Sequence, residues 1–356
     1  MKKKILLSVL TIILLCLSYI FITKTANNPN DFESEVQTAS NHEKLQVHFI
    51  DVGQADATLI TYGNHSMLID GGNVEDGELV SDYLADQGIK KLDYVIGTHP
   101  HEDHIGGIDD IVHNYPINLF FMPDYKMDTD VYKDVINELV QRDLVITKPV
   151  VGSKYTLGDC YFTIISPNSS DYGDNANNYS IGIKLTYKDT SFVMVGDAEE
   201  LSEDEMLQNN IDLTADVYKV SHHGSYTSNS AGFLKAIDPT YAVISVGKEN
   251  KYGHPNIEVL SRLIDDDVQI YRTDDNGTII VTSDGKNITF NVKKIANESN
   301  QSKDNDNNDL EVFVTKSGTK YHRKDCSYLN DSKTSLSLNE AKVSGYNPCS
   351  KCNPPK

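Results

Sequence analysis

The chain is poor in positive charge. Its 356 residues include 32 lysines and arginines against 52 acidic residues, which gives a formal net charge of −20 at pH 7. A negative field of this size repels polyanions, so the chain as a whole lacks the electrostatic footprint of a general nucleic-acid binder. The same field suits divalent cations. With 39% hydrophobic residues, the composition fits a globular protein with a sizeable core, and the length usually allows two domains.

Long apolar runs are also scarce. One run extends from about residue 5 to residue 22 and follows three lysines at 2–4, as in a targeting segment. No second run of that length occurs, so nothing predicts a multi-pass protein. Residues 1–26 are expected to be a signal peptide or a membrane anchor. The anchor is favoured because residues 24–26 are a poor cleavage site. The remainder would be exported, either anchored on the outer face of the membrane or secreted.

Cysteine is rare, and three of the five cysteines lie in the last 31 residues. With one histidine they form the pattern His322-x3-Cys326-x22-Cys349-x2-Cys352. This spacing predicts a tetrahedral structural zinc site. In so short a segment, metal binding supplies folding free energy that a small core lacks. The alternative is a disulfide between Cys349 and Cys352 with Cys326 left free.

Polar, aperiodic stretches divide the chain. Residues 27–43 are expected to be a tether, and residues 296–309 a disordered linker. Residues 44–295 alternate strand-like and helical patterns, and residues 310–356 form a compact module with the His/Cys pattern. Strands are predicted at 45–51, 57–61, 67–70, 94–97, 161–165, 181–187, 192–195, 217–220, 241–245 and 278–282, and helices at 78–87, 132–142, 199–209, 232–237 and 256–264.

The pattern His99-x-His101-x-Asp103-His104 is the strongest chemical signal in the chain. It follows an apolar run that predicts a buried strand and precedes a spacing that predicts a helix. The four side chains are thus expected on a loop at the C-terminal end of a strand, where α/β sheets usually carry their chemistry. Imidazole nitrogens suit zinc, iron or manganese, and a carboxylate adds a hard oxygen donor. His99 and His101 can hold one ion, while Asp103 and His104 reach a second.

Further predicted strands end in the same kinds of residue. Asp70 closes one strand before a glycine turn, and either positions the histidine loop or serves only as a turn residue. Asp197 closes another and could bridge two cations. A third strand ends at the pair His222-His223. Buried strands do not place polar ligands at their ends for packing alone, so these residues are expected to share one site.

Together these segments resemble the metallo-β-lactamase-fold hydrolases, in the branch related to the C-terminal domain of ComEC competence proteins. The likeness covers roughly residues 45–294 and implies an αββα sandwich with the site at one edge of the two sheets. It is carried by segments at 48–57, 68–72, 98–107, 177–180, 196–198, 221–225 and 250–255.

The resemblance implies a two-metal site. His99 and His101 would bind the first metal, Asp103 and His104 the second, and Asp197 would bridge them. His222 or His223 would complete the second site, and the other of the pair would face the substrate. The metals would be zinc or manganese.

One departure from the family pattern concerns the first metal, for which many members supply a further histidine before the bridging aspartate. No histidine occurs between His113 and His222. The first metal is therefore short of one protein ligand, with Asn178 or Ser180 as neighbours.

Asp103, Asp197 and His254 are the expected catalytic residues. Two cations about 3.5–4 Å apart lower the pKa of a bridging water and stabilise displacement at phosphorus. His254 could steady a leaving oxygen or a phosphate, or could instead precede a helix as a capping residue. Asp51 is either a structural loop residue or part of the rim of the site.

The C-terminal module resembles the zinc-binding domain of the Ada repair protein, with His322 where a first cysteine would stand. Between residues 310 and 356 it carries eight lysines and arginines and four acidic residues, a net charge of +4. It could therefore contact a polyanion such as DNA or teichoic acid.

Three functions follow as expectations. The first is an exported, metal-dependent phosphodiesterase or nuclease that acts on DNA. The second is a phosphodiesterase for small or cell-surface substrates such as phosphocholine esters, since an acidic rim tolerates a cationic group better than a DNA backbone. The third is a non-catalytic surface-binding protein. DNA or another phosphate polymer and the membrane are the expected partners, and the oligomeric state is left open.

Overall fold

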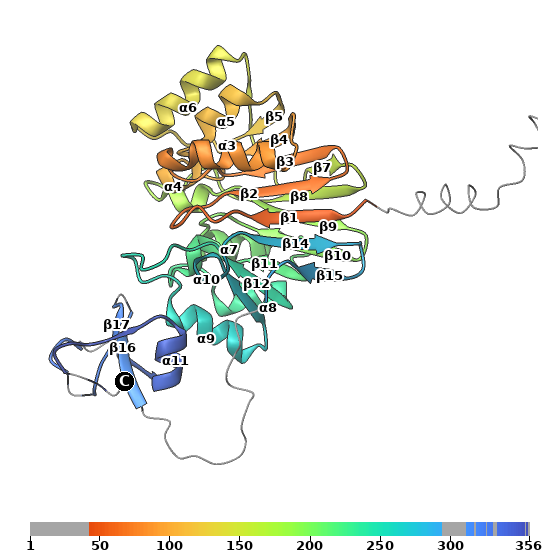
Figure 1. Cartoon of the computed structure of the whole chain (residues 1–356). Helices are drawn as coiled ribbons and strands as arrows, with labels where there is room; N and C mark the ends of the chain where they lie inside the picture. Colours follow the sequence, from red (N-terminus) through yellow and green to blue (C-terminus); the bar gives the residue numbers. More distant parts are fainter. Residues whose placement is uncertain are drawn as a thin grey trace, which may run out of the picture. The chain divides into compact units, whose positions relative to one another are not determined.

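The computed structural model describes residues 43–293, 311–316, 318–324, 326–329, 333–352 and 354. Within residues 43–293 the strands form one sheet of eight and one of seven (Figure 1). The eight-stranded sheet has the order β15 (Ile288–Phe290), β14 (Ile279–Ser283), β1 (Leu45–Phe49), β2 (Thr58–Tyr62), β3 (His65–Ile69), β4 (Leu92–Ile96), β5 (Ile117–Phe121) and β6 (Ile146–Thr147). The seven-stranded sheet has the order β13 (Gln269–Arg272), β12 (Tyr241–Ile244), β11 (Val217–Lys219), β10 (Thr190–Met194), β9 (Gly182–Tyr187), β8 (Cys160–Ser166) and β7 (Lys154–Leu157).

Helices cover the outer faces of both sheets. Those packed on the eight-stranded sheet are α3 (Gly77–Asp86), α5 (Ile108–Asn114) and α6 (Asp130–Gln141), and those on the seven-stranded sheet are α7 (Glu200–Gln208), α8 (Ala231–Ile237) and α9 (Ile257–Asp265). Shorter helical turns are η2 (Val74–Asp76), α4 (Glu102–Ile105), η3 (Ala176–Tyr179), η4 (Ser221–Gly224) and α10 (Thr273–Asn276).

The alternation of side chains along the strands of the two large sheets creates three apolar cores. Met67 of β3 and Phe192 of β10 belong to the core between the sheets. Their neighbours Leu68 and Val193 face outward, into the cores beneath the two helical layers. Each fully buried side chain of this size contributes about 1.5–3 kcal/mol. The expected αββα sandwich is confirmed.

The topology brings several strand ends to one place. Strands β3, β4 and β5 are parallel neighbours, as are β10, β11 and β12. The C-terminal ends of each set therefore lie at a common edge. The segments that follow β3, β4, β10 and β11 carry Asp70, the His99–His104 pattern, Asp197 and the His222-His223 pair.

The sequence patterns locate the long helices to within two residues at each end but omit β5, β6, β7, β13 and β15. In β5, Asn118 and Leu119 are both exposed, so the burial pattern does not alternate. The predicted loop after β4 is partly wrong. Glu102–Ile105 form the short helix α4, because Ile105 N and Gly106 N donate hydrogen bonds to His101 O and Glu102 O.

Within the described segments, no helix combines the length and the apolar character needed to cross a bilayer. The predicted leader at 1–26, the linker at 296–309 and all but the last residue of the tether at 27–43 lie outside those segments. These boundaries stay predictions.

A buried histidine in β1 makes stability depend on pH. His48 is 1% exposed, and its Nδ1 lies 2.8 Å from the Tyr83 hydroxyl. Burial lowers the pKa of His48 to about 4, whereas an unfolded histidine has a pKa near 6.5. Between these values the unfolded chain binds the extra proton, so stability is lost as the pH falls from about 6.5 toward about 4.

We expect His48→Gln to remove this part of the acid destabilisation, which amounts to roughly 3 kcal/mol. Denaturant unfolding of both proteins at a series of pH values measures it. His113→Gln is the matched control because the His113 side chain is 64% exposed, and it should keep the native pH slope. Identical slopes for the native chain and His48→Gln would contradict the prediction.

Candidate metal centre

Asp70 fixes the geometry of the histidine loop. It follows β3, is 1% exposed, and has a left-handed φ of 60°. Its Oδ1 accepts a hydrogen bond from Thr98 N at 2.8 Å, and its Oδ2 accepts one from Thr98 Oγ1 at 2.8 Å. His104 Nδ1 also lies 2.8 Å from Asp70 Oδ2. Asp70 therefore holds Nδ1 of His104 and leaves Nε2 directed to the other side.

Three buried atoms meet there that have no hydrogen-bond partner within the described residues: His104 Nε2, His223 Nε2 and Asp197 Oδ1. His104 Nε2 lies 3.2 Å from Asp197 Oδ1, and His223 Nε2 lies 3.8 Å from Asp197 Oδ2. The opposite nitrogen of His223, Nδ1, lies 2.9 Å from the carbonyl oxygen of Ser245. Buried polar atoms are normally paired, so this arrangement fits atoms that bind a cation.

Asp103 adds a second carboxylate on the more open side. Its side chain is 34% exposed, and Oδ2 lies 3.4 Å from His223 Nε2 and 4.0 Å from His104 Nε2. Burial alone would raise the pKa of Asp103, but the charge of His104 and the nearby His223 ring hold it well below its usual range. Asp103 is therefore ionised, as a metal ligand must be.

Asp197 and His104 each shift the pKa of the other. Burial opposes the charge of Asp197, yet His104, His222 and His223 hold its pKa well below the usual value. Burial likewise opposes the charge of His104, but the surrounding carboxylates, Asp197 foremost, raise its pKa well above the usual value. Without metal, His104 thus supplies a positive charge that a bound cation would replace.

His99 and His101 form a neighbouring pair of donors. His99 Nε2 lies 3.0 Å from His101 Nδ1, a separation that one ion bound by both nitrogens would produce. Burial, and then the charge of His104, lowers the pKa of both histidines. Both are therefore neutral, which is the form that binds metals.

The pair His222-His223 differs from the expected strand end. Both residues lie in η4 with a φ of 53°, so their backbone is left-handed and does not continue the strand. The rings still diverge, with an interplanar angle of 67°. His223 is buried behind Asp103, whereas His222 is 21% exposed, with Nε2 3.5 Å from Asp197 Oδ2.

Ser180 lies beside the first histidine, whereas Asn178 accepts hydrogen bonds from the start of α7. Ser180 Oγ lies 3.3 Å from His99 Nδ1 and accepts a hydrogen bond from Asp197 N at 3.1 Å. Asn178 Oδ1 accepts a hydrogen bond from Glu199 N at 3.1 Å. Ser180 thus connects the first histidine to the Asp197 backbone, and Asn178 supports the start of α7.

His254 lies beside both histidines of the pair. Its ring stacks on that of His223, with centroids 6.3 Å apart and planes at 19°, and meets that of His222 edge to face at 5.6 Å. The cap of α9 is Asn256, so His254 is not the capping residue. Burial and the charges of the pair lower the pKa of His254 to about 4.

Asp51 lies apart from these donors. It is exposed, its Oδ1 accepts a hydrogen bond from Gly53 N at 3.2 Å, and it lines a separate acidic cavity with Glu78 and Tyr83. A different cavity of about 520 Å³ opens beside Asp103. Its lining includes the acidic residues Glu75, Asp76, Glu102 and Asp103, together with Lys251 and Tyr252.

Sequence reasoning did not select Asp56, which the structure brings to the site. Asp56 is 1% exposed and offers an oxygen within 4.8 Å of ligand atoms of His104, Asp197 and His223. The available signal was its position just before β2, in a segment that carries the family likeness.

Comparison with known proteins agrees with this geometry. A model of the metallo-beta-lactamase superfamily matches residues 50–129. ComE operon protein 3 of Bacillus subtilis (strain 168) is 29% identical over 265 residues, which are 69% of this chain and 34% of that protein. Recombination protein 2 of Haemophilus influenzae is 31% identical over 225 residues, 61% of this chain and 26% of that protein. Competence protein ComA of Neisseria gonorrhoeae is 26% identical over 233 residues, 64% of this chain and 31% of that protein.

This chain is a metallo-β-lactamase-fold protein. It is related to the three proteins above, as the sequence resemblance implied, and it spans only 26–34% of their length. Its buried Asp56, His104, Asp197 and His223 side chains could together hold a metal ion.

The C-terminal module of this metallo-β-lactamase-fold chain gathers the second set of donors. Its described elements are β16 (Glu311–Thr315), β17 (Lys320–Tyr321), β18 (Lys333–Ser337), α11 (Leu338–Val343) and β19 (Asn347–Pro348). His322 Nδ1 lies 3.1 Å from Cys326 Sγ and 3.9 Å from Cys352 Sγ, and Cys326 Sγ lies 4.0 Å from Cys349 Sγ. All three cysteines are free thiols, so the arrangement favours a zinc site over the alternative disulfide.

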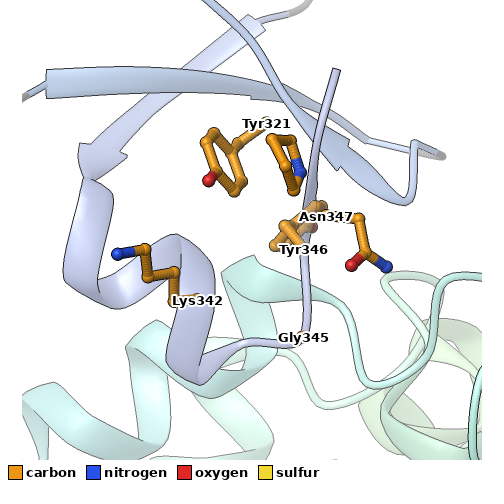
Figure 2. Close-up of a pocket in the computed structure, with 6 residues that line it drawn as sticks. Tyr321, Lys342, Gly345, Tyr346 and Asn347 are labelled. Atoms are coloured by element: carbon orange, nitrogen blue, oxygen red, sulfur yellow. The ribbon is translucent and has the colours of Figure 1, made fainter. Parts of the chain in front are cut away.

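The module also contains a cavity of about 360 Å³ (Figure 2). Tyr321, Lys342, Gly345, Tyr346, Asn347 and Pro348 line it. Burial raises the pKa of Tyr346 to about 12, so its phenol is neutral. Lys342 is the charged residue in this lining.

Substitution of the two adjacent histidines separates their roles. We expect His223→Asn to lose about one equivalent of bound Mn²⁺, because it removes a buried nitrogen that faces Asp103 and Asp197. His222→Asn should retain that equivalent. Metal analysis after dialysis measures both, and the reverse order of loss would contradict the assignment.

Removal of one module cysteine tests the structural zinc. We expect Cys349→Ser to lose one equivalent of zinc and to destabilise the module, since structural zinc contributes directly to folding. Zinc analysis and limited proteolysis measure these effects. Cys160→Ser is the control because Cys160 is a buried free thiol in β8. Full zinc content in Cys349→Ser would contradict the site.

Proposed function

We propose that the chain is an exported, membrane-anchored phosphodiesterase that uses two divalent metals to cleave DNA. The observation that carries the proposal is the convergence of His104 Nε2, His223 Nε2 and Asp197 Oδ1, all buried and none with a hydrogen-bond partner in the part of the chain that the structure describes. These donors suit manganese or zinc.

The donors form two groups, one made of His99 and His101 and one made of Asp103, His104 and His223, and the ligands are assigned accordingly. His99 and His101 would hold the first metal. Asp103, His104 and His223 would hold the second, and Asp197 would supply a further carboxylate. When bound, such a pair of cations activates water and stabilises the charge that develops at a phosphorus centre.

His222 and His254 act on the open side of the Asp197 carboxylate. His222 Nδ1 lies 3.3 Å from Thr227 Oγ1, which donates a hydrogen bond to Glu199 at 2.9 Å. This chain of contacts fixes the ring of His222. His254, neutral at pH 7 because its pKa is about 4, can donate a hydrogen bond to a phosphate oxygen without carrying a net charge.

Two observations support DNA as the substrate. The names of two relatives, Recombination protein 2 and Competence protein ComA, refer to processes that handle DNA. The module carries a net charge of +4 on a chain whose total is −20. It therefore offers the positive surface for a polyanion that the rest of the chain lacks.

A second candidate is a phosphodiesterase for smaller substrates with a cationic group, such as phosphocholine esters. The acidic lining of the cavity beside Asp103 favours it, because carboxylates attract a cation and repel a second phosphate. Phosphate polymers of the cell surface would be the natural context for such a substrate.

The test is hydrolysis by the purified full-length chain with Mn²⁺ or Zn²⁺. Single-stranded and double-stranded DNA are assayed beside p-nitrophenyl phosphodiesters and a phosphocholine diester. We expect DNA cleavage that Asp197→Asn reduces by at least about 100-fold, since that carboxylate lies beside His104, His222 and His223. Asp130→Asn, whose side chain is fully exposed, should leave it unchanged.

The pattern of activity separates the candidates. Turnover of the choline ester without DNA cleavage would replace the nuclease assignment with the second candidate. Absence of all hydrolysis in a protein that binds two metals would contradict both and favour a surface-binding role.

A further inference from the structure

Lys219 is the lysine that lies buried within the described segments. It ends β11 and is 5% exposed. Its Nζ forms an ion pair with Oδ2 of Asp56, which is 1% exposed and lies between β1 and β2. The pair therefore joins the two sheets beside the metal centre. Burying two charges is costly, and a buried ion pair is weak evidence for added stability, so this pair is better explained by the site it borders.

Asp56 lies on the Nδ1 side of the His104 and His223 rings, opposite the Nε2 atoms. Its Oδ1 lies 3.8 Å from His223 Nδ1, and its Oδ2 lies 3.9 Å from His104 Nδ1. Asp103 instead faces the Nε2 atoms, at 3.4 Å from that of His223. A cation on the two Nε2 atoms would meet Asp103, while Asp56 would lie on the far side of the rings.

Asp56 is nevertheless close enough to compete for a cation. One of its oxygens lies within 4.8 Å of ligand atoms of His104, Asp197 and His223. Its Oδ1 is buried and has no hydrogen-bond partner in the described structure. If it were released from its ion pair with Lys219, the Asp56 carboxylate would be attracted to a divalent cation in this buried site.

We propose that Lys219 is a positioning residue, which holds Asp56 behind His104 and His223 and keeps that carboxylate out of the second metal's coordination. The inference rests on the metal site in the proposed function but not on its substrate. Two consequences follow. Asp103 remains the carboxylate ligand beside the open cavity, and the positive charge of Lys219 weakens cation binding at the second site.

The test is calorimetric titration of the metal-free, full-length chain with Mn²⁺, with His104→Ala to identify the second site. Lys219→Met should tighten Mn²⁺ binding there by about tenfold, because it removes a nearby positive charge and releases Asp56. The same variant should hydrolyse substrate more slowly. Asp56→Asn should weaken Mn²⁺ binding by about tenfold, because it leaves Lys219 without its anion.

The double variant Lys219→Met/Asp56→Asn removes both charges and should bind Mn²⁺ within about threefold of the native chain. Lys184→Met is the control, because Lys184 pairs with Asp212 at a site where Asp212 is 69% exposed. It should leave Mn²⁺ affinity unchanged.

A purely structural ion pair predicts a different result, in which Lys219→Met and Asp56→Asn both weaken Mn²⁺ binding. That outcome would overturn the proposal. If Lys219→Met does not fold, the Mn²⁺ affinities of Asp56→Asn and of the double variant test the proposal. Native Mn²⁺ affinity in Asp56→Asn, or a double variant that binds no better than Asp56→Asn, would equally overturn it.

Discussion

The hydrogen bonds of the buried Asp70 carboxylate are the constraint on which the metal centre depends. One oxygen accepts from Thr98 N, and the other contacts Thr98 Oγ1 and His104 Nδ1. The strand end of β3 thereby sets both the path of the loop after β4 and the direction of the His104 ring. The turn also packs tightly, since a Cβ on Gly107 would lie 2.4 Å from Gly71 O. A side chain there would push the Asp70 turn away from the start of α5.

Charge explains why this edge of the sandwich suits cations. Asp70, Asp103 and Asp197 surround His104, and their combined field raises its pKa well above the usual value despite burial. A protonated His104 offsets part of this negative charge in the metal-free cluster, and divalent cations would offset more. The acidic surface of the chain acts in the same direction. A phosphate substrate is then attracted only where metals or the basic module make the local electrostatic potential positive.

Much of this arrangement could be predicted from the sequence, for identifiable reasons. Strand ends that carry Asp or His can be recognised in the sequence because apolar runs precede them. Recognising these ends allowed Asp70, Asp197 and the His99–His104 pattern to be assigned to one site. The direction in which each histidine ring points could not be predicted from the sequence. His222 and His223 adopt left-handed backbone conformations in η4, which no periodicity encodes. Asp56 and Lys219 are distant in sequence and meet only because β2 and β11 belong to sheets that face each other.

The most direct test of this account is anomalous diffraction from crystals of the Mn²⁺-loaded chain. The account predicts two manganese peaks about 3.5–4 Å apart, one beside His99 and His101, one beside His104 and His223, with the Asp197 carboxylate between them. A single peak, or a manganese ion coordinated by Asp56 with Asp197 turned away, would contradict it.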